Sequence, residues 1–433
     1  MPPQHLYPWA VQAAAPPLTV TRASGSHFYD TDGNRYLDLS GQLAYVNVGH
    51  GHPRVVEAIR RQAETLPVIS PNYATIPASR LTEMLAELTP GDLNRPFFTL
   101  GGAEANEHAI RIARSVTGRR KIVTRYQSYH GSTLGAMAAS GDNRRFYAEP
   151  LPGGFVHTVD PYRYRCPFCR DAESCNMGCF RALQATVEGE DPRTVAAILI
   201  EPVTGLSGLV VPPDGYLQAV RELCDRYGIL LILDEVITGF CRTGRWFGSE
   251  HWNVVADIMT VAKGITSGYV PLGAAIVSER VAEHFNRHYL GSGLTYSAHP
   301  LACAAAVAVL EVYVEEELAD RAERVGGWLL EQLRELGRRH PSVGEVRGIG
   351  LMTTIELVKN PETREPLTPQ RTEEPVSAEM AEVRTSVLAH RVHPLFRWNL
   401  VVITPPLTIS EAELADGLEA IEAGLNVADR AVG

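Results

Sequence analysis

Lysine is nearly missing from this 433-residue sequence: Lys and Arg together number 40, but only Lys121, Lys263 and Lys359 are lysines. Basic clusters are missing as well, and the formal net charge is −10, which argues against a nucleic-acid partner. No apolar run approaches about 18 residues, so we expect no contact with the membrane interior. Residues 1–20 contain neither a basic stretch nor a continuous apolar one, so we predict no secretion signal and a cytoplasmic protein.

The order of apolar runs predicts an α/β fold. A composition of 45% hydrophobic and 21% charged residues is typical of a globular chain with two or three folding units. Between residues 97 and 310, short apolar runs alternate with helical patterns, which indicates a mostly parallel sheet covered by helices on both faces. The runs are PFFTL, KIVTRY, VAAILIEPV, ILLILDEV, IMTVAKG and GAAIVS. After residue 310, long charged helices are followed by further strands.

Three shorter patterns predict local structure. Asp32-Gly33 separates two alternating stretches, as in a hairpin turn. Residues 215–228, GYLQAVRELCDRYG, place apolar side chains on one helical face and end at a glycine, which is a helix stop. Ser410 and Glu413 have the spacing of a capping box at the start of the last helix.

Two charged residues stand at the ends of apolar runs. In LLILDEV, four aliphatic residues lead directly into Asp234, and a buried carboxylate is costly unless a cation or hydrogen-bond donor meets it. In IMTVAKG, Lys263 follows a short apolar strand and begins a glycine-rich stretch. Lys121 and Lys359 lie in polar surroundings. Lys263 is therefore the lysine with a candidate chemical role.

Two further motifs lie at predicted strand ends, where ligands bind in parallel sheets. The stretch TLGGAEANEHAIR passes from strand to helix through Gly101, Gly102 and Ala103, without a side chain suited to cap the helix. Either water or a phosphate could satisfy the first backbone N–H groups. The stretch YQSYHGSTLGAM puts Tyr129 beside a glycine after the strand KIVTRY, either as a packing residue or as an aromatic platform.

Together, these features match the requirements of one cofactor. Pyridoxal phosphate needs a lysine for a Schiff base, a carboxylate at its pyridine nitrogen and a phosphate site. We therefore interpret Asp234 as the partner of a pyridinium and Lys263 as the Schiff-base lysine. The alternative for Asp234 is an ion pair with a nearby arginine.

The sequence resembles the class III aminotransferases, which are pyridoxal-phosphate enzymes of fold type I. The resemblance extends over nearly the whole chain, and its motifs occur in the family's order. They are DLSGQLAYVNVGHGHP, GGAEANEHAIRIAR, YHGSTLGAM, LIEPVTGLSG, LLILDEVITGFCRTG, TVAKGITSGYVPLGA and GLTYSAHPLACAAA.

The resemblance implies roles for individual residues. Lys263 would carry the cofactor and then move protons, and Asp234 would bind the pyridine nitrogen. Val236 and Tyr129 would pack on opposite faces of the ring. The remaining residues that we assign to the cofactor site lie in the same motifs and are Gly102 and Ala103 at the phosphate, His130, Gly131 and Glu201.

The resemblance also implies a large cofactor domain and a small α+β domain built from both ends of the chain. We expect residues 1–75 to form an arm and the first part of the small domain, residues 76–320 the large domain, and residues 321–433 the rest of the small domain. Thr295 would complete the phosphate site of a neighbouring subunit. This predicts a homodimer with shared active sites, whose dimers could pair into tetramers.

The substrate is predicted from departures from the family pattern. Leu206 stands where ornithine- and GABA-type members have a glutamate that holds a mobile arginine, which argues against those activities. Arg397 is the candidate for binding the carboxylate of pyruvate, and a surface role is the alternative. Tyr45 is a candidate substrate residue, and the small Ala44 before it is expected to enlarge the pocket.

We therefore predict transamination from an amine or ω-amino compound to pyruvate, closest in pattern to amine–pyruvate and taurine–pyruvate enzymes. Without an acid at Leu206, we expect a mobile arginine to swing towards solvent. 2-Oxoglutarate has a second carboxylate, and no second cation is evident in the motifs that form the pocket. Because that carboxylate would stay unpaired, we expect 2-oxoglutarate to be a poor acceptor. The alternatives are an aminomutase or a dialkylglycine-type decarboxylase of the same fold, or a regulatory protein that binds the cofactor without catalysis.

Four cysteines are clustered as Cys166, Cys169, Cys175 and Cys179, spaced C-x2-C-x5-C-x3-C. This spacing could hold a structural zinc ion. A disulfide or a reduced cap over the active-site entrance is the alternative, and we favour it because transamination needs no metal. Cys224, Cys241 and Cys303 are expected to be core residues.

Overall fold

A seven-stranded sheet forms the centre of the larger domain in the computed structural model, which describes residues 5–12, 18–169, 175–370 and 376–432. Its strand order is β4-β10-β9-β8-β7-β5-β6, and only β10 runs antiparallel to its neighbours. The strands are β4 (Leu93–Thr99), β5 (Lys121–Arg125), β6 (Phe155–Thr158), β7 (Val195–Ile200), β8 (Leu230–Asp234), β9 (Ile258–Val261) and β10 (Gly273–Ser278). The six predicted apolar runs all form strands of this sheet, which confirms the α/β prediction. Edge strand β6 was not predicted.

Alternate residues of each central strand pack into two separate apolar clusters. In β8, Leu231 and Leu233 belong to one cluster, whereas Leu230 and Ile232 belong to the other. A strand buried on both faces in this way reads as a continuous apolar run. The helices of this domain are α2 (Pro53–Thr65), α3 (Ile76–Leu88), α4 (Gly102–Thr117), α5 (Leu134–Ala139), α6 (Gly178–Gly189), α7 (Tyr216–Tyr227), α8 (Glu279–His284) and α9 (Pro300–Glu315).

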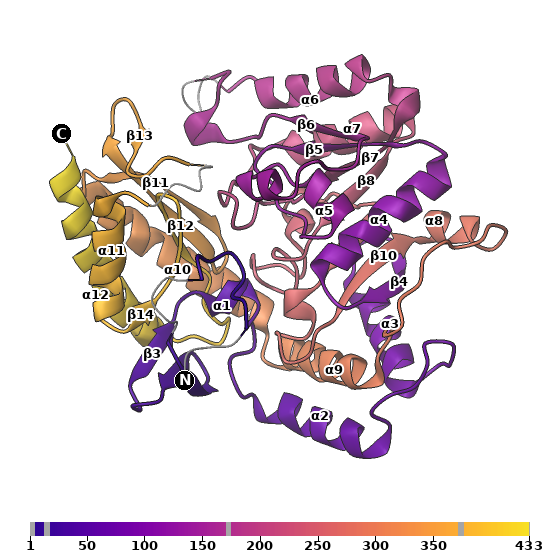
Figure 1. The fold of residues 1–433 in the computed structure, drawn as a ribbon, viewed down its shortest axis with the longest axis horizontal. Helices are drawn as coiled ribbons and strands as arrows, with labels where there is room; N and C mark the ends of the chain where they lie inside the picture. The colour runs from indigo at the N-terminus through magenta and orange to yellow at the C-terminus, as the bar shows by residue number, and fades with distance from the viewer. Residues whose placement is uncertain (1–4, 13–17, 170–174, 371–375, 433) are drawn as a thin grey trace.

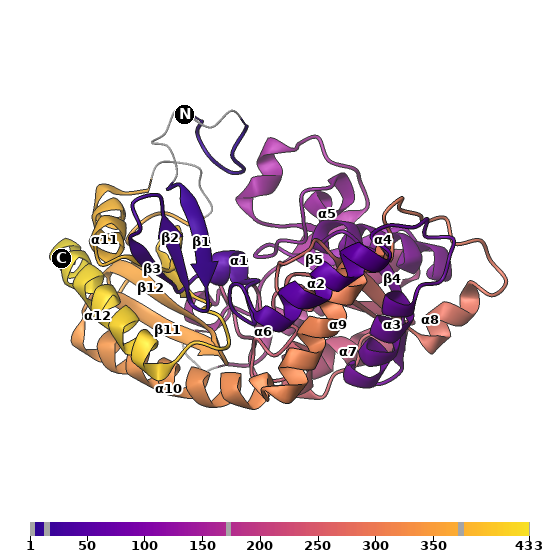
Figure 2. The same ribbon diagram turned by 90° about the horizontal axis from the view of Figure 1, so that it is seen from below.

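The smaller domain joins segments from both ends of the chain (Figures 1 and 2). One sheet contains β1 (Val20–Ser24), β2 (His27–Asp30), β3 (Arg35–Asp38) and β14 (Val392–His393), and β14 lies parallel to β3. The other contains β11 (Val343–Ile349), β12 (Met352–Asn360), β13 (Glu365–Pro366), β15 (Leu395–Arg397) and β16 (Leu400–Ile403). Helices α10 (Leu318–Arg339), α11 (Ala378–Ala389) and α12 (Glu411–Ala428) complete the domain, and α1 (Gly41–Ala44) is a short turn after β3.

The predicted local features are present. The Asp32-Gly33 turn joins β2 to β3, and α7 ends at Gly228 with a left-handed φ of 60°. Ser410 and Glu413 form the expected capping box at the start of α12. Helix α2, which falls within the segment 1–75, packs against α9 of the larger domain, and Arg54 bonds Glu311 there.

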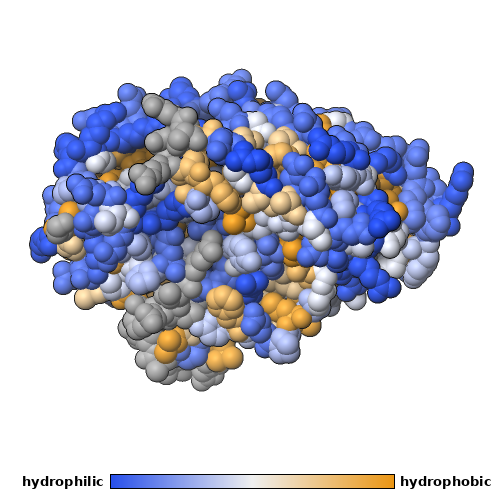
Figure 3. All heavy atoms as spheres, turned by 90° about the horizontal axis from the view of Figure 1, so that it is seen from above, coloured by the Kyte–Doolittle hydropathy of each residue, from blue (hydrophilic) through white to orange (hydrophobic). Residues whose placement is uncertain are grey.

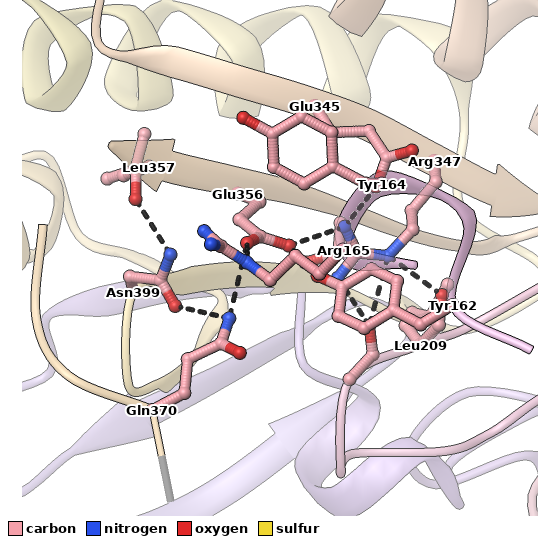
Figure 4. Close-up of polar contacts among 12 residues, drawn as sticks. Tyr162, Tyr164, Arg165, Leu209, Glu345, Arg347, Glu356, Leu357, Gln370 and Asn399 are labelled. Atoms are coloured by element: carbon pink, nitrogen blue, oxygen red, sulfur yellow. Dashed lines mark hydrogen bonds and ion pairs between the residues drawn. The ribbon is translucent and has the colours of Figure 1, made fainter. Parts of the chain in front are cut away.

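A buried polar cluster joins the two domains (Figure 4). Glu356 on β12 has no exposed side-chain surface, and it accepts hydrogen bonds from Arg165 Nε at 2.6 Å and Arg347 Nη1 at 2.7 Å. Arg347, on β11, also donates from Nε to the carbonyl oxygens of Gly208 and Leu209, at 3.0 and 3.1 Å. The larger domain's loops are thus tied to the smaller domain through charged hydrogen bonds, which are stronger than neutral ones.

Among the described residues, no helix combines the length and apolar character needed to cross a membrane.

Candidate active site

A cavity of about 350 Å³ lies beside the carboxyl ends of strands β8 and β9. This is the edge at which open parallel sheets bind ligands. Most of the predicted cofactor residues share its lining, which is contributed by loops far apart in the sequence. The predicted residues that line it are Tyr45, Gly102, Ala103, Tyr129, His130, Gly131, Asp234, Val236 and Lys263.

Asp234 is the last residue of β8 and is almost completely buried. Its Oδ2 is 2.7 Å from His130 Nδ1 and accepts a hydrogen bond from Asn106 Nδ2 at 2.8 Å. Its Oδ1 accepts from the Val236 backbone N–H at 3.0 Å. Among the described residues, this carboxylate is therefore held by a histidine, an amide and a backbone group, and not by the arginine considered as the alternative. Both oxygens of the carboxylate are thus held in place, and Asp234 borders the cavity.

Lys263 borders the same cavity and stands just after β9, at the start of a 3₁₀ turn. Its backbone φ of 47° is left-handed, a conformation that costs energy in a residue with a side chain. Burial lowers the pKa of its ammonium, and Arg144 lowers it further, whereas Asp234 and Glu201 oppose the shift. A lowered pKa increases the fraction of neutral amine, the form that acts as a nucleophile and as a base.

The N-terminus of α4 forms another part of the lining. Gly101 precedes the helix without a side-chain cap, as predicted, so the first N–H groups of the helix are open to a ligand. A Cβ at Gly102 would lie 2.9 Å from Val236 Cγ1, and a Cβ at Gly131 would overlap Ala103. Gly131 also has a left-handed φ of 134°. The missing side chains therefore let the start of α4 approach Val236 and the loop after β5 approach Ala103.

Glu201 supports the site from behind and is absent from the cavity lining. Its Oε1 accepts from the Tyr129 N–H at 3.3 Å, and its Oε2 accepts from the Gly205 N–H at 2.6 Å. Burial raises the pKa of Glu201 to about 7, with a further contribution from Asp234, against the lowering effect of His130 and Arg125. It orients the Tyr129 backbone and leaves the ring free to form a wall of the cavity.

These residues fit pyridoxal phosphate. The uncapped helix start and the two glycines suit a phosphate, and the anchored carboxylate suits a protonated pyridine nitrogen. Lys263 and Tyr129 border the same cavity, where they suit a carbonyl carbon and a flat ring. The donor set thus matches each part of the cofactor.

The predicted substrate residues do not all line one cavity, whereas most of the predicted cofactor residues do. Tyr45 lines this cavity and also a neighbouring apolar one of about 520 Å³. Ala44 is buried and lines neither, so the expectation that its small size enlarges the pocket is wrong. Leu206 packs against the apolar core and is not part of the cavity lining.

Two arginines lie close to the site, and the expectations about a mobile arginine and about 2-oxoglutarate stay predictions. Arg397 Nη2 lies 3.6 Å from Asp142 Oδ2 and donates to Asn143 Oδ1 at 2.9 Å. The guanidinium carbon of Arg144 lies 3.5 Å from the centre of the Tyr129 ring, and Arg144 is not part of the cavity lining.

Sequence reasoning missed three polar residues near the site: Asn106, Asp142 and Arg144. Asn106 was detectable, because it is a polar residue on the buried face of α4, between Ala105 and Ala109. It links Asp234 to Thr260, whose Oγ1 donates to Asn106 Oδ1 at 2.8 Å. Asp142 and Arg144 lie in the polar stretch GDNRR, which had no distinguishing periodicity.

Thr295 lies on the surface in the connection between α8 and α9, outside the cavity of its own chain. Its role in a neighbouring subunit therefore stays a prediction.

Cys166, Cys169, Cys175 and Cys179 are free thiols, and the described residues contain no group of three or more metal ligands arranged to hold an ion. Nearby Cys166 is the largest cause that raises the pKa of the Cys169 thiol, to about 12, followed by burial and Cys175. Cys224, Cys241 and Cys303 are buried, as predicted.

Comparison with known proteins identifies the family. The family model for class III aminotransferases matches residues 9–425. A taurine–pyruvate aminotransferase from Bilophila wadsworthia is 33% identical, over 96% of this chain and 94% of that protein. Among solved structures, a taurine:2-oxoglutarate aminotransferase from Bifidobacterium kashiwanohense, in complex with PLP and glutamate, has a TM-score of 0.94 and 41% identity, over 98% of this chain and 96% of that one. An (S)-enantioselective ω-transaminase from Thermomicrobium roseum has a TM-score of 0.92 and 39% identity, with the same coverage.

The chain belongs to the class III aminotransferases. It has the fold-type I architecture of these transferases, it is a transaminase, and its cofactor is pyridoxal phosphate.

Proposed function

We propose that this aminotransferase moves an amino group from an amine or ω-amino compound to pyruvate, which becomes alanine. The observation that carries the proposal is the shared cavity of Lys263, Asp234 and the uncapped start of α4. The pyruvate acceptor is supported by Arg397, which can bind one carboxylate, and by the name of the taurine–pyruvate relative. The second candidate acceptor is 2-oxoglutarate, because Arg144 provides another cation near Tyr129.

In this proposal, each residue acts at a defined atom. When bound, pyridoxal phosphate supplies a carbonyl carbon that carries the amino group and a ring that takes up electrons. Lys263 Nζ would hold the cofactor and, as a free amine, would move a proton from the donor carbon. Asp234, held by His130 and Asn106, would keep a proton on the ring nitrogen. A second half-reaction with the keto acid runs the same proton movements in reverse.

The remaining cofactor contacts orient these atoms. The backbone N–H groups of Gly102 and Ala103 would bind the phosphate, and the missing side chain of Gly131 lets its loop pack closely against Ala103. Tyr129 and Val236 would cover opposite faces of the ring and exclude water from it. Water exclusion strengthens the charge interactions of Asp234 and Lys263.

A homodimer with shared sites is part of the proposal. Its support is the exposed position of Thr295 and several large apolar residues on the surface. Tyr73, Ile76 and Tyr289 are 66%, 88% and 92% exposed in the single chain, and burying them would favour association. Figure 3 shows apolar patches within an otherwise polar face. A cytoplasmic location stays a prediction of the sequence.

The test is a set of separate half-reactions. Purified enzyme is mixed with 1-phenylethylamine, putrescine, taurine or β-alanine, and the cofactor's visible absorbance is followed. Pyruvate or 2-oxoglutarate is then added, and alanine, glutamate and CO₂ are measured. Alanine formation without CO₂ release is expected. CO₂ release would indicate a decarboxylase, rearranged donor without a new amino acid would indicate an aminomutase, and no spectral change with any amine would favour a non-catalytic regulator.

A further inference from the structure

A cavity of about 590 Å³ lies at the end of strand β5 opposite to the candidate active site. It is formed by the last turn of α4 and by the loops that precede β5 and β6. Its lining residues are Arg114, Ser115, Gly118, Arg119, Arg120, Gly153 and Gly154. Among the described residues, this lining contains three arginines and no acid, in a chain whose net charge is −10. The cavity is therefore a local concentration of positive charge.

Arg119 is held in place by uncharged partners. Its Nη1 lies 2.9 to 3.2 Å from four backbone carbonyl oxygens, those of Pro192, Val195, Tyr227 and Gly228. A carbonyl oxygen fixes the guanidinium but carries no net charge. The positive charge of Arg119 thus stays at the cavity without an acid to neutralise it.

Arg114 is also fixed without an acidic partner. Its Nε donates to the Arg120 carbonyl oxygen at 2.8 Å, and its guanidinium carbon lies 5.0 Å from the centre of the Phe155 ring. Burial lowers the pKa of Arg114, Glu107 opposes this shift, and Arg120 lowers the pKa further. Two like charges are therefore held near one another, and an anion in the cavity would relieve their repulsion.

The acids beside this cavity are engaged by other cations. Lys121 Nζ lies 2.7 Å from Glu190 Oε2, and Arg193 Nη2 lies 2.8 Å from Asp191 Oδ2. Arg120 is exposed, and within the described part of the chain its side chain donates to no protein acceptor. Its guanidinium is thus available to a ligand from solvent.

The cavity has room for a ligand of moderate size. A Cβ at Gly118 or Gly153 would meet no described atom within 4 Å, so these two positions border open space. Pockets for small molecules have volumes of about 300–1,000 Å³, and guanidinium groups match the geometry of phosphate oxygens. A bounded cavity of this size favours a small molecule over a membrane surface or a nucleic acid.

We propose that this cavity binds the phosphate group of a small soluble phosphorylated molecule through Arg114, Arg119 and Arg120. The site is separate from that of the cofactor phosphate, which we place at the other end of α4. The inference does not depend on which amine or keto acid the enzyme uses.

The test is a calorimetric titration of the holoenzyme with glycerol 3-phosphate, with glycerol as the uncharged match. We expect saturable binding of glycerol 3-phosphate and no binding of glycerol. Arg120→Gln should weaken the binding on the order of 10-fold, because one charged hydrogen bond is lost, and Arg120→Lys should weaken it less. No saturable binding to the parent, or equal affinity in Arg120→Gln, would overturn the proposal.

Arg193→Gln is the matched control, because it removes a positive charge from the same end of the sheet outside the cavity lining. Arg193 is 88% exposed, so this change is expected to fold, and its affinity for glycerol 3-phosphate should equal that of the parent. An equal loss in Arg193→Gln and Arg120→Gln would show an effect of overall charge and would overturn the proposal.

Vesicles of phosphatidylcholine and phosphatidic acid present the same kind of phosphate group on a membrane surface. We expect the holoenzyme to stay in solution when these vesicles are sedimented. Sedimentation with the vesicles, without binding of glycerol 3-phosphate, would assign the arginines to a membrane surface and would overturn the proposal.

Discussion

Replacing Glu356 with glutamine tests whether the buried cluster in Figure 4 holds the two domains together. The change keeps the shape of the side chain and removes the negative charge shared by Arg165 and Arg347. Removing one partner of a buried ion pair lowers the free energy of unfolding by about 3–5 kcal/mol. Because glutamine retains atoms that can form hydrogen bonds, we expect a loss of about 3 kcal/mol. We therefore expect the unfolding temperature of Glu356→Gln to fall by several degrees at pH 7.

Glu345→Gln is the matched control, since Glu345 bonds the same nitrogen of Arg347 at 2.6 Å. Glu345 is 25% exposed, and burial raises its pKa despite Arg347, so its charged form contributes little to stability. We expect Glu345→Gln to lower the free energy of unfolding by less than about 1 kcal/mol. Calorimetry of both variants would refute the reasoning if their losses were equal.

The effect of pH on Glu356 follows from its pKa. Burial alone would raise this pKa, but Arg347 and Arg165 hold it below the usual 4.5. An acid with a lowered pKa in the folded state contributes stability that is complete above its unfolded pKa and is lost as the pH falls through the folded value. The difference in the free energy of unfolding between the parent and Glu356→Gln should thus stay constant down to pH 4.5 and shrink below it. A difference that shrinks between pH 7 and 5 would contradict this assignment.

Three further substitutions address the site. Asp234→Asn should slow the amine half-reaction at least about a hundredfold, because the charge that holds the ring proton is lost, and stopped-flow absorbance measures this; a parental rate would exclude the assigned role. Gly131→Ala should lower cofactor retention after dialysis, since the added methyl group overlaps Ala103, whereas Gly153→Ala meets open space and should retain it; equal retention in both would exclude the proposed close approach. Arg397→Ala should lower kcat/KM for pyruvate on the order of 10- to 100-fold and affect the amine half-reaction much less; equal losses would argue for a structural arginine.

The parts of the fold that the sequence predicts are those encoded by local patterns. Apolar runs in alternation with helices predict the central sheet, and the Asp32-Gly33 turn, the Gly228 helix stop and the Ser410 cap depend on neighbouring residues alone. Strand β6 was missed because Phe155–Thr158 is short, lies at the edge of the sheet and is only partly buried, so its apolar signal is weak.

In the candidate site, too, the sequence predicts the residues that a local pattern marks and misses those that only distant contacts bring together. Asp234 and Lys263 stand out in sequence because charge interrupts an apolar run. The Asn106–Asp234 hydrogen bond spans 128 positions, and Arg397 reaches Asn143 across 254. Contacts of this kind depend on how the domains pack, and no local pattern reports them. The proximity of Arg397 to Asp142 is a further example, because the two residues lie in different domains.

The central claim is that Lys263 carries the cofactor and performs the proton transfer. The scarcity of lysine makes a direct measurement possible, because only Lys121, Lys263 and Lys359 could form a Schiff base through a side chain. The holoenzyme is reduced with borohydride and digested, and the peptide that retains the cofactor is identified by mass spectrometry. Lys263→Ala and Lys121→Ala are treated in parallel. We predict labelling of Lys263 in the parent and in Lys121→Ala, with no labelling or amine turnover in Lys263→Ala. Labelling of Lys121 or Lys359 in the parent, or turnover by Lys263→Ala, would contradict the account.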